Sequence, residues 1–203
     1  MSKFLKLFLL TTAVAAGLGC VSPFYGTARI EKGWNMDVGV AACTFANTLG
    51  TLHYLAGMRG DCEIRYGINN YFQANGRIGA GFGYKVLSDE QEPTKNGPFL
   101  LLDGALGLQA AYSINKVTPA LRIEAGPVIS IIPVVGFGNH EWLSIGSKIS
   151  TPYDTKELIP ELFVTIHLLE RWSIFGGVNM LTIASPEWEY PVASLGVGYN
   201  IFR

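Results

Sequence analysis

The sequence predicts an all-β fold: an antiparallel, transmembrane, up-and-down β-barrel of about ten strands, with eight strands as the alternative. Charged residues make up 15% of the 203 residues and the mean hydropathy is +0.27, whereas a soluble domain carries about 25% charged residues. After Ala16 no apolar run is long enough for a transmembrane helix. Instead, segments of roughly ten residues alternate between apolar and polar side chains, as in strands that face lipid on one side.

The N-terminus has the layout of a secretory signal. Lys3 and Lys6 precede the apolar run 7–16, and "GLGC" follows at residues 17–20. A basic start, a short apolar stretch and small residues before a cut are typical of a cleavable signal peptide. The apolar run is also too short to cross a bilayer.

Cys20 directly after Gly19 makes this signal resemble that of a bacterial lipoprotein, which implies lipidation at Cys20. An ordinary signal cut nearby, with Cys20 incidental, is the other interpretation. In either case residues 1–19 are expected to be a signal peptide. We expect residues 20–32 to be a periplasmic lead segment and residues 33–203 to form the barrel.

Nine segments alternate with a period of two, which places successive side chains on opposite faces of a strand. They are 34–45, 53–67, 72–78, 82–86, 100–109, 121–126, 162–168, 172–180 and 193–201. A weaker candidate, 142–149, is accepted as the tenth strand, because an even count returns the C-terminus to the periplasmic side, as in bacterial barrels. If residues 126–148 are partly a loop, the count is eight.

This strand assignment also places each connection between strands on the periplasmic side or on the outer side. "GINN" (67–70) and "LLER" (168–171) fall on the periplasmic side, with the long charged stretch 88–97. The outer connections are 46–51, 113–116, 150–157 and 184–189, with a very short link at Gly79–Ala80. Aromatic residues then form two belts at the strand ends, as expected where rings meet lipid headgroups. The periplasmic belt is Trp34, Tyr66, Tyr71, Trp142, Trp172 and Tyr199, and the outer belt is Phe45, Tyr54, Tyr112 and Trp188.

The polar faces of the strands carry a charge cluster that we expect to point into the lumen. Its positive residues are Arg59, Arg65, Arg77, Lys85 and Arg122, and its negative residues are Asp37, Asp61, Glu63, Asp103, Glu124 and Glu161. The two signs nearly balance, which in a narrow barrel predicts a lumen packed by salt bridges. A selective channel more often shows an excess of one sign.

Few residues suggest nucleic-acid binding, cofactor binding, catalysis or a disulfide. The net charge of −1 and the absence of like-charge blocks argue against a nucleic-acid partner. Neither metal-ligand spacing nor a phosphate-binding loop occurs, so no cofactor is expected. His53, His140 and His167 lack a surrounding motif, although an enzyme would need a His with a carboxylate or Ser near the outer rim. Cys43 and Cys62 fall on opposite faces, which predicts free thiols.

Three stretches carry a resemblance to a known family: "TARIEKGWNMDVGVAA", "MRGDCEIRYGINNYFQANGRIGAGFGYKVL" and "GPFLLLDGALGLQ". They resemble the small outer-membrane β-barrel proteins of Gram-negative bacteria. The resemblance implies a place in the outer membrane, with outer-membrane lipid and the barrel-assembly machinery as partners. It also implies an assembly signal in the last strand, which here falls on Ser194, Gly196, Tyr199, Ile201 and Phe202.

The function expected from these features is a structural, surface or small-ligand binding role without catalysis. The ligand itself is unknown. Three alternatives stay open: a small selective channel, an outer-membrane lipid-modifying or proteolytic enzyme, and a soluble lipocalin-like barrel tethered through Cys20. The last would need a polar outward face.

Overall fold

The computed structural model describes residues 18–19, 23–47, 53–85, 99–152, 158–168, 171–180 and 192–202. Most of these residues lie in strands. The strands are β1 (Leu18–Gly19), β2 (Gly33–Asn47), β3 (His53–Gly67), β4 (Phe72–Lys85), β5 (Phe99–Ala111), β6 (Val117–Ala125), β7 (Val128–Phe137), β8 (Leu143–Pro152), β9 (Ile159–Leu168), β10 (Trp172–Asn179) and β11 (Ala193–Asn200). In this described part of the chain, no helix has the length and apolar character needed to cross a membrane.

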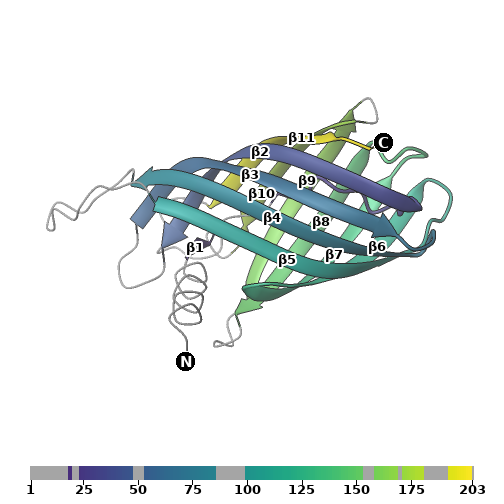
Figure 1. Ribbon diagram of the computed structural model, residues 1–203, viewed down its shortest axis with the longest axis horizontal. Coiled ribbons are helices and arrows are strands. Elements are labelled where there is room, and N and C mark those ends of the chain that lie inside the picture. Colours follow the sequence, from purple (N-terminus) through teal and green to yellow (C-terminus); the bar gives the residue numbers. More distant parts are fainter. Residues whose placement is uncertain are drawn as a thin grey trace, which may run out of the picture.

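Strands β2 to β11 form a closed antiparallel barrel, which confirms the predicted fold class and the count of ten. Each strand pairs with its neighbours in sequence, and β11 returns to pair with β2 (Figure 1). Closure leaves these strands without an open edge. The two-residue strand β1 adds to the far end of β2, with Leu18 opposite Asn47 and Gly19 opposite Ala46.

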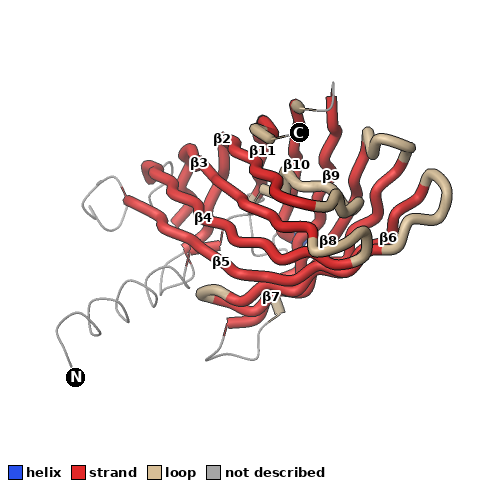
Figure 2. Tube along the Cα trace, turned by 45° about the vertical axis from the view of Figure 1, so that its right-hand side comes forward, coloured by secondary structure: helices blue, strands red, loops and turns tan. Residues whose placement is uncertain are grey.

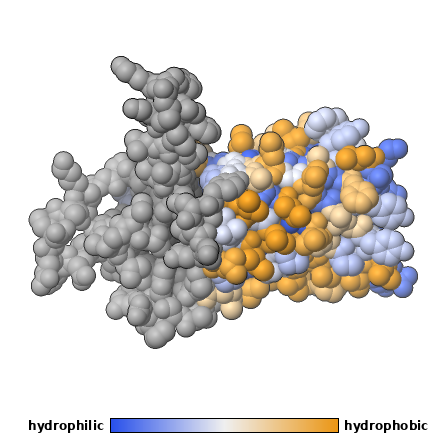
Figure 3. Space-filling model, turned by 90° about the horizontal axis from the view of Figure 1, so that it is seen from below, coloured by the Kyte–Doolittle hydropathy of each residue, from blue (hydrophilic) through white to orange (hydrophobic). Residues whose placement is uncertain are grey.

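The period-two pattern decides which side chains face outward. In β5, Leu102, Leu106 and Leu108 are all exposed on the outer surface, whereas Gln109 is buried inside. Figure 3 shows apolar side chains gathered over the outer side of the barrel. Apolar residues of these strands therefore cover the outside, and most of the buried inward side chains are polar or charged, which is the reverse of a soluble protein.

Two strands differ from the sequence prediction, although the total is right. Residues 72–78 and 82–85 belong to one continuous strand, β4, and Gly79–Ala80 is not a turn. The alternation continues through that dipeptide, but its small side chains hide it. The missing strand is β7, within the region 126–148 that had been considered partly a loop.

Merging β4 moves several connections to the opposite end of the barrel. We call the end where β2 begins the turn end and the end where β2 finishes the loop end. The sequence analysis placed 113–116 on the outer side with 46–51, but this stretch joins β5 to β6 at the turn end. It placed the charged stretch 88–97 on the periplasmic side, but this stretch belongs to the connection between β4 and β5 at the loop end. The longest connections, 86–98 and 180–192, thus both belong to the loop end.

The aromatic residues at the turn end lie in contacting pairs on the outer surface. Trp34 and Tyr66 have ring centroids 4.9 Å apart, and so do Trp172 and Tyr199. Tyr112 stacks on Tyr71 at 6.0 Å, so it belongs to this belt and not to the outer one. The side chains of Phe45, Tyr54 and Trp188 lie outside the described part of the chain.

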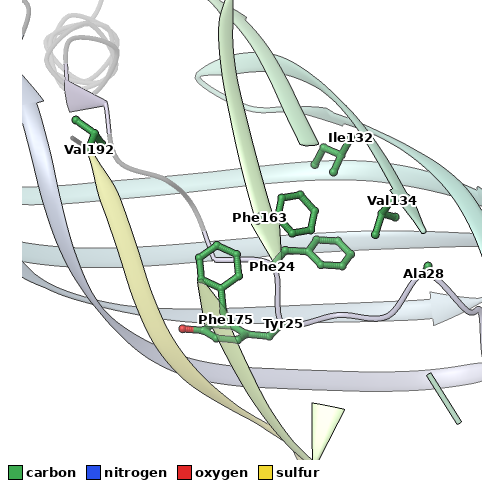
Figure 4. Packing of buried hydrophobic residues seen from close by; sticks show 8 residues of the cluster. All are labelled: Phe24, Tyr25, Ala28, Ile132, Val134, Phe163, Phe175 and Val192. Carbon is green, nitrogen blue, oxygen red and sulfur yellow. The ribbon is translucent and has the colours of Figure 1, made fainter. Parts of the chain in front are cut away.

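Residues 23–30 run through the interior of the barrel, and we call them the internal segment. Phe24, Tyr25 and Ala28 are buried there (Figure 4). Ile30 is buried as well. The segment reaches the turn end, where Gly33, with a φ of 99°, turns the chain into β2. The sequence analysis predicted a periplasmic lead segment at residues 20–32, whereas the structure places the apolar side chains of residues 23–30 inside the lumen. Figure 2 shows the same barrel turned by 45°.

Candidate functional site in the barrel lumen

The lumen has two chemically different sides. We call the inward-facing charged residues of β3 to β6 the charged wall. They are Arg59, Asp61, Glu63, Arg65, Arg77, Asp103, Arg122 and Glu124, joined by Asp37 of β2. Alternation along β3 places four of these residues in a row on one face. All of them are buried except Asp103, whose side chain is 21% exposed.

Salt bridges join the charged wall into one continuous chain of contacts. Arg122 is its centre: Nη1 lies 2.7 Å from Glu63 Oε1 and Nη2 lies 2.6 Å from Glu124 Oε1. Arg77 Nη2 lies 3.4 Å from Glu124 and 3.5 Å from Asp103.

The chain continues at both of its ends. Arg59 donates from Nε to Asp61 Oδ2 at 2.8 Å and lies 3.3 Å from Asp103. Arg65 pairs with Asp37 and lies 3.6 Å from Glu63. Because buried charges are strongly unfavourable unless they are paired, this network is a condition for filling the lumen with polar residues.

The other residues of the expected cluster lie apart from this chain. Glu161 is buried in β9, opposite Lys148 of β8 in the strand register. The sequence analysis missed Lys148, because β8 was the weakest strand candidate and was not assigned faces. The side chain of Lys85 lies outside the described part of the chain.

The opposite side, which we call the aromatic wall, consists of the inward residues Ile132, Val134, Phe163 and Phe175 of β7, β9 and β10. It packs against the internal segment. Phe24 lies 5.0 Å from Phe163 between ring centroids, and Tyr25 meets Phe175 edge-on at 6.0 Å (Figure 4). Phe24 also lies 5.4 Å from the Arg122 guanidinium, which covers its ring and links the two walls.

Inward polar side chains of β5 and β9 also bind the main chain of the internal segment. Thr165 Oγ1 donates to the Phe24 carbonyl at 2.7 Å. Gln109 Nε2 donates to the carbonyls of Thr27 at 3.1 Å and Ala28 at 2.9 Å. These bonds satisfy backbone groups that a segment without strand pairing would otherwise bury unpaired.

Glu141, in the connection between β7 and β8, holds the end of the internal segment. Its carboxylate accepts the N–H groups of Ala28 at 2.5 Å and Arg29 at 2.6 Å. Glu141 has a φ of 49°, unusual for a residue with a side chain, and Gly136 leaves the space that its carboxylate occupies. Burial raises the pKa of Glu141 above its ordinary value, and the N–H donors oppose that rise.

Ser144, Glu141 and His167 form a cluster that superficially resembles hydrolytic machinery. Ser144 Oγ donates to Glu141 Oε1 at 2.7 Å and lies 2.8 Å from His167 Nε2. However, Ser144 is 0% exposed, so no substrate can reach its oxygen, and the Ser stands between the His and the Glu instead of the His bridging the other two. The cluster orients Glu141 toward the internal segment.

Two small cavities lie among the described residues of this interior. One, at the turn end, is bordered by Tyr25, Asp37, Arg65 and Asn200, and another by Pro23, Glu124 and Lys148. Each has a volume of about 10 Å³, which is room for about one water molecule. In the described residues, no group of three His, Cys, Asp or Glu side chains could hold a metal ion.

The remaining residues singled out in the sequence belong to the expected assembly signal at β11 or are cysteines. Ser194 and Gly196 point inward and Tyr199 outward in β11, whereas Ile201 and Phe202 are exposed beyond its last residue. Cys43 is buried inside and Cys62 faces outward, and no disulfide joins them. Cys20 lies outside the described residues.

These features define the class of protein: a closed β-barrel with an apolar outer face and an interior filled by ion pairs and by its own N-terminal residues. No protein-family model matches the chain, and no curated protein matches it. Among solved structures it is similar to Ail, the attachment invasion locus protein of Yersinia pestis, with a TM-score of 0.34 and 13% identity over 84% of this chain and 100% of that one. A second structure of Ail, in complex with the heparin analogue sucrose octasulfate, gives a TM-score of 0.30 and 10% identity over the same shares.

Proposed function

We propose that the chain spans the outer membrane of a Gram-negative bacterium as a closed, non-conducting barrel with a structural or surface role. The turn end lies in the periplasm and the loop end outside. Support for this orientation comes from the connections, because barrels of this kind have short periplasmic turns and longer extracellular loops. An apolar outer face supports a lipid environment over a soluble, tethered barrel.

One observation carries the proposal of a closed lumen: paired charges and the internal segment fill the space that a channel would leave open. Arg122 illustrates this, since it is fully buried between two carboxylates and the ring of Phe24. Catalysis has no support from the interior either, because Ser144 is inaccessible. Any binding role then falls to the outer surface or the loops.

Conductance in planar lipid bilayers tests the closed lumen. A folded sample is identified by a difference in gel migration between unboiled and boiled protein. This folded protein should insert into the bilayer without producing discrete current steps. Reproducible steps of one size would contradict a closed lumen and favour the channel alternative.

The membrane assignment is tested by Val40→Arg, in the middle of β2 on the outer face, where Val40 is 56% exposed. A basic residue at a bilayer midplane costs roughly 2–4 kcal/mol, so urea unfolding in lipid should show a loss of this size. Lys116→Arg, in an exposed turn, is the control. Equal stability of the two variants would favour the soluble barrel.

The assembly signal and the lipid anchor are part of the same proposal. Tyr199→Ala combined with Ile201→Ala should reduce the amount of protein in the outer-membrane fraction more than it reduces unfolding stability in lipid. Normal insertion of a merely less stable protein would contradict a signal role for these residues. Mass spectrometry of the mature protein decides whether Cys20 is acylated.

A further inference from the structure

The seam where the barrel closes, between β2 and β11, has almost no inward side chains in the middle of its length. Gly39 lies opposite Gly198, and Ala41 lies opposite Gly196. Side-chain pairs across neighbouring strands normally supply much of the stability of a sheet. On its inward face, this closing seam therefore lacks the side-chain contacts that the charged wall has in abundance.

The ring of Tyr25 occupies the space that these glycines leave. A Cβ atom added to Gly39 or Gly198 would overlap the carbon atoms of the ring, and one added to Gly196 would overlap its hydroxyl oxygen. Phe175, which lies opposite Gly196 in the register of β10 and β11, closes the side of this space. The two strands of the seam thus share one aromatic ring that belongs to neither of them.

We infer that this glycine-lined slot is a binding site for a phenol ring, filled from within the same chain by Tyr25, and that the seam stays closed only while the ring is in place. The ring contacts both strands at once, so its removal takes away packing from each side of the seam. A gap in the packing loses dispersion contacts outright, because no other group lies there. The rest of the barrel keeps its own cross-strand pairs.

The test compares local opening at two seams in Tyr25→Ala, refolded at full length in lipid. Amide hydrogen exchange reports opening of each seam separately. Exchange in β11 and in the facing part of β2 should accelerate roughly tenfold or more, which corresponds to a decrease of about 1.4 kcal/mol in the free energy of local opening. Exchange in β6 and β7 should change little. Adding p-cresol, the side chain of tyrosine as a free molecule, should slow the seam again, because cavities left in packed interiors bind small aromatic molecules.

Two further variants make the result specific. Gly198→Ala keeps Tyr25 but places a methyl group where the ring lies, so it should open the same seam, and p-cresol should not restore it. Tyr71→Ala removes an exposed tyrosine of the aromatic belt at the turn end and should leave seam exchange unchanged, with or without p-cresol.

Equal acceleration at both seams, or no response of Tyr25→Ala to p-cresol, would overturn the inference. If Tyr25→Ala does not fold in the absence of p-cresol, recovery of the folded gel band on adding p-cresol supports a phenol site. Failure to recover, together with unchanged seam exchange in Gly198→Ala, would rule the site out.

Discussion

The two walls of the lumen fill the same kind of space in different ways. The charged wall uses its own side chains, and each arginine there contacts at least two carboxylates, as Arg77 contacts Asp103 and Glu124. The aromatic wall cannot fill its half alone, and Phe163 and Phe175 complete their packing with residues from the internal segment. One half of the lumen is therefore a property of the strands, and the other depends on a segment that is not part of the sheet.

The charged wall should respond most strongly to the loss of a single partner. Arg122→Ala leaves Glu63 and Glu124 buried without their closest cation, and breaking a buried ion pair in this way costs about 3–5 kcal/mol. Urea unfolding of the protein in lipid measures the loss. Lys116→Ala, in an exposed turn, should stay within about 0.5 kcal/mol of wild type. Similar values for both variants would mean that water replaces Arg122.

The attachment of the internal segment should depend on Glu141. Glu141→Ala leaves the N–H groups of Ala28 and Arg29 without their acceptor, and each buried unsatisfied group costs about 1–3 kcal/mol. Glu141→Gln keeps an oxygen acceptor and should lose less. The measurement is unfolding free energy, together with protease sensitivity of the N-terminal residues. An Ala variant as stable as the Gln variant would show that the carboxylate does not hold the segment.

Double-mutant cycles should show that residues within one wall are energetically coupled in unfolding and that residues of different walls are not. Glu63→Gln and Arg122→Gln remove partners in one ion pair, so their combined effect should deviate from the sum by about 0.5–3 kcal/mol. Arg59→Gln and Phe175→Leu act on different walls and should add to within about 0.5 kcal/mol. Strong coupling of the second pair would mean that the two walls behave as a single packing unit.

Much of the fold follows from alternation alone. In β3 the spacing of two places the charges at 59, 61, 63 and 65 on one face of the strand, and their burial shows that this face is the inner one. The same reasoning assigns both faces of β11. The faces of these strands can be predicted from the sequence, because one face meets apolar surroundings and the other meets charged side chains.

The parts that sequence reasoning missed lack that contrast. β7 is apolar on both faces, since its inward residues Ile132 and Val134 belong to the aromatic wall. A strand of this kind carries no period-two signal. The internal segment has no repeating pattern at all, so nothing local indicates that Phe24 and Tyr25 lie inside. A long-range packing relation of this type is visible only in three dimensions.

The strand order has a consequence for how fast the barrel can form. Every pairing from β2–β3 to β10–β11 joins strands that are neighbours in sequence. Among the strands that the structure describes, only the pairing of β2 with β11 joins distant ones, as where Gly39 meets Gly198. Contacts between distant residues carry the largest entropy loss and slow folding the most. Assembly of this protein therefore consists of a series of local steps and one remote step. Changes near that remote contact should slow assembly, whereas equally destabilising changes in the local hairpins should mainly speed unfolding.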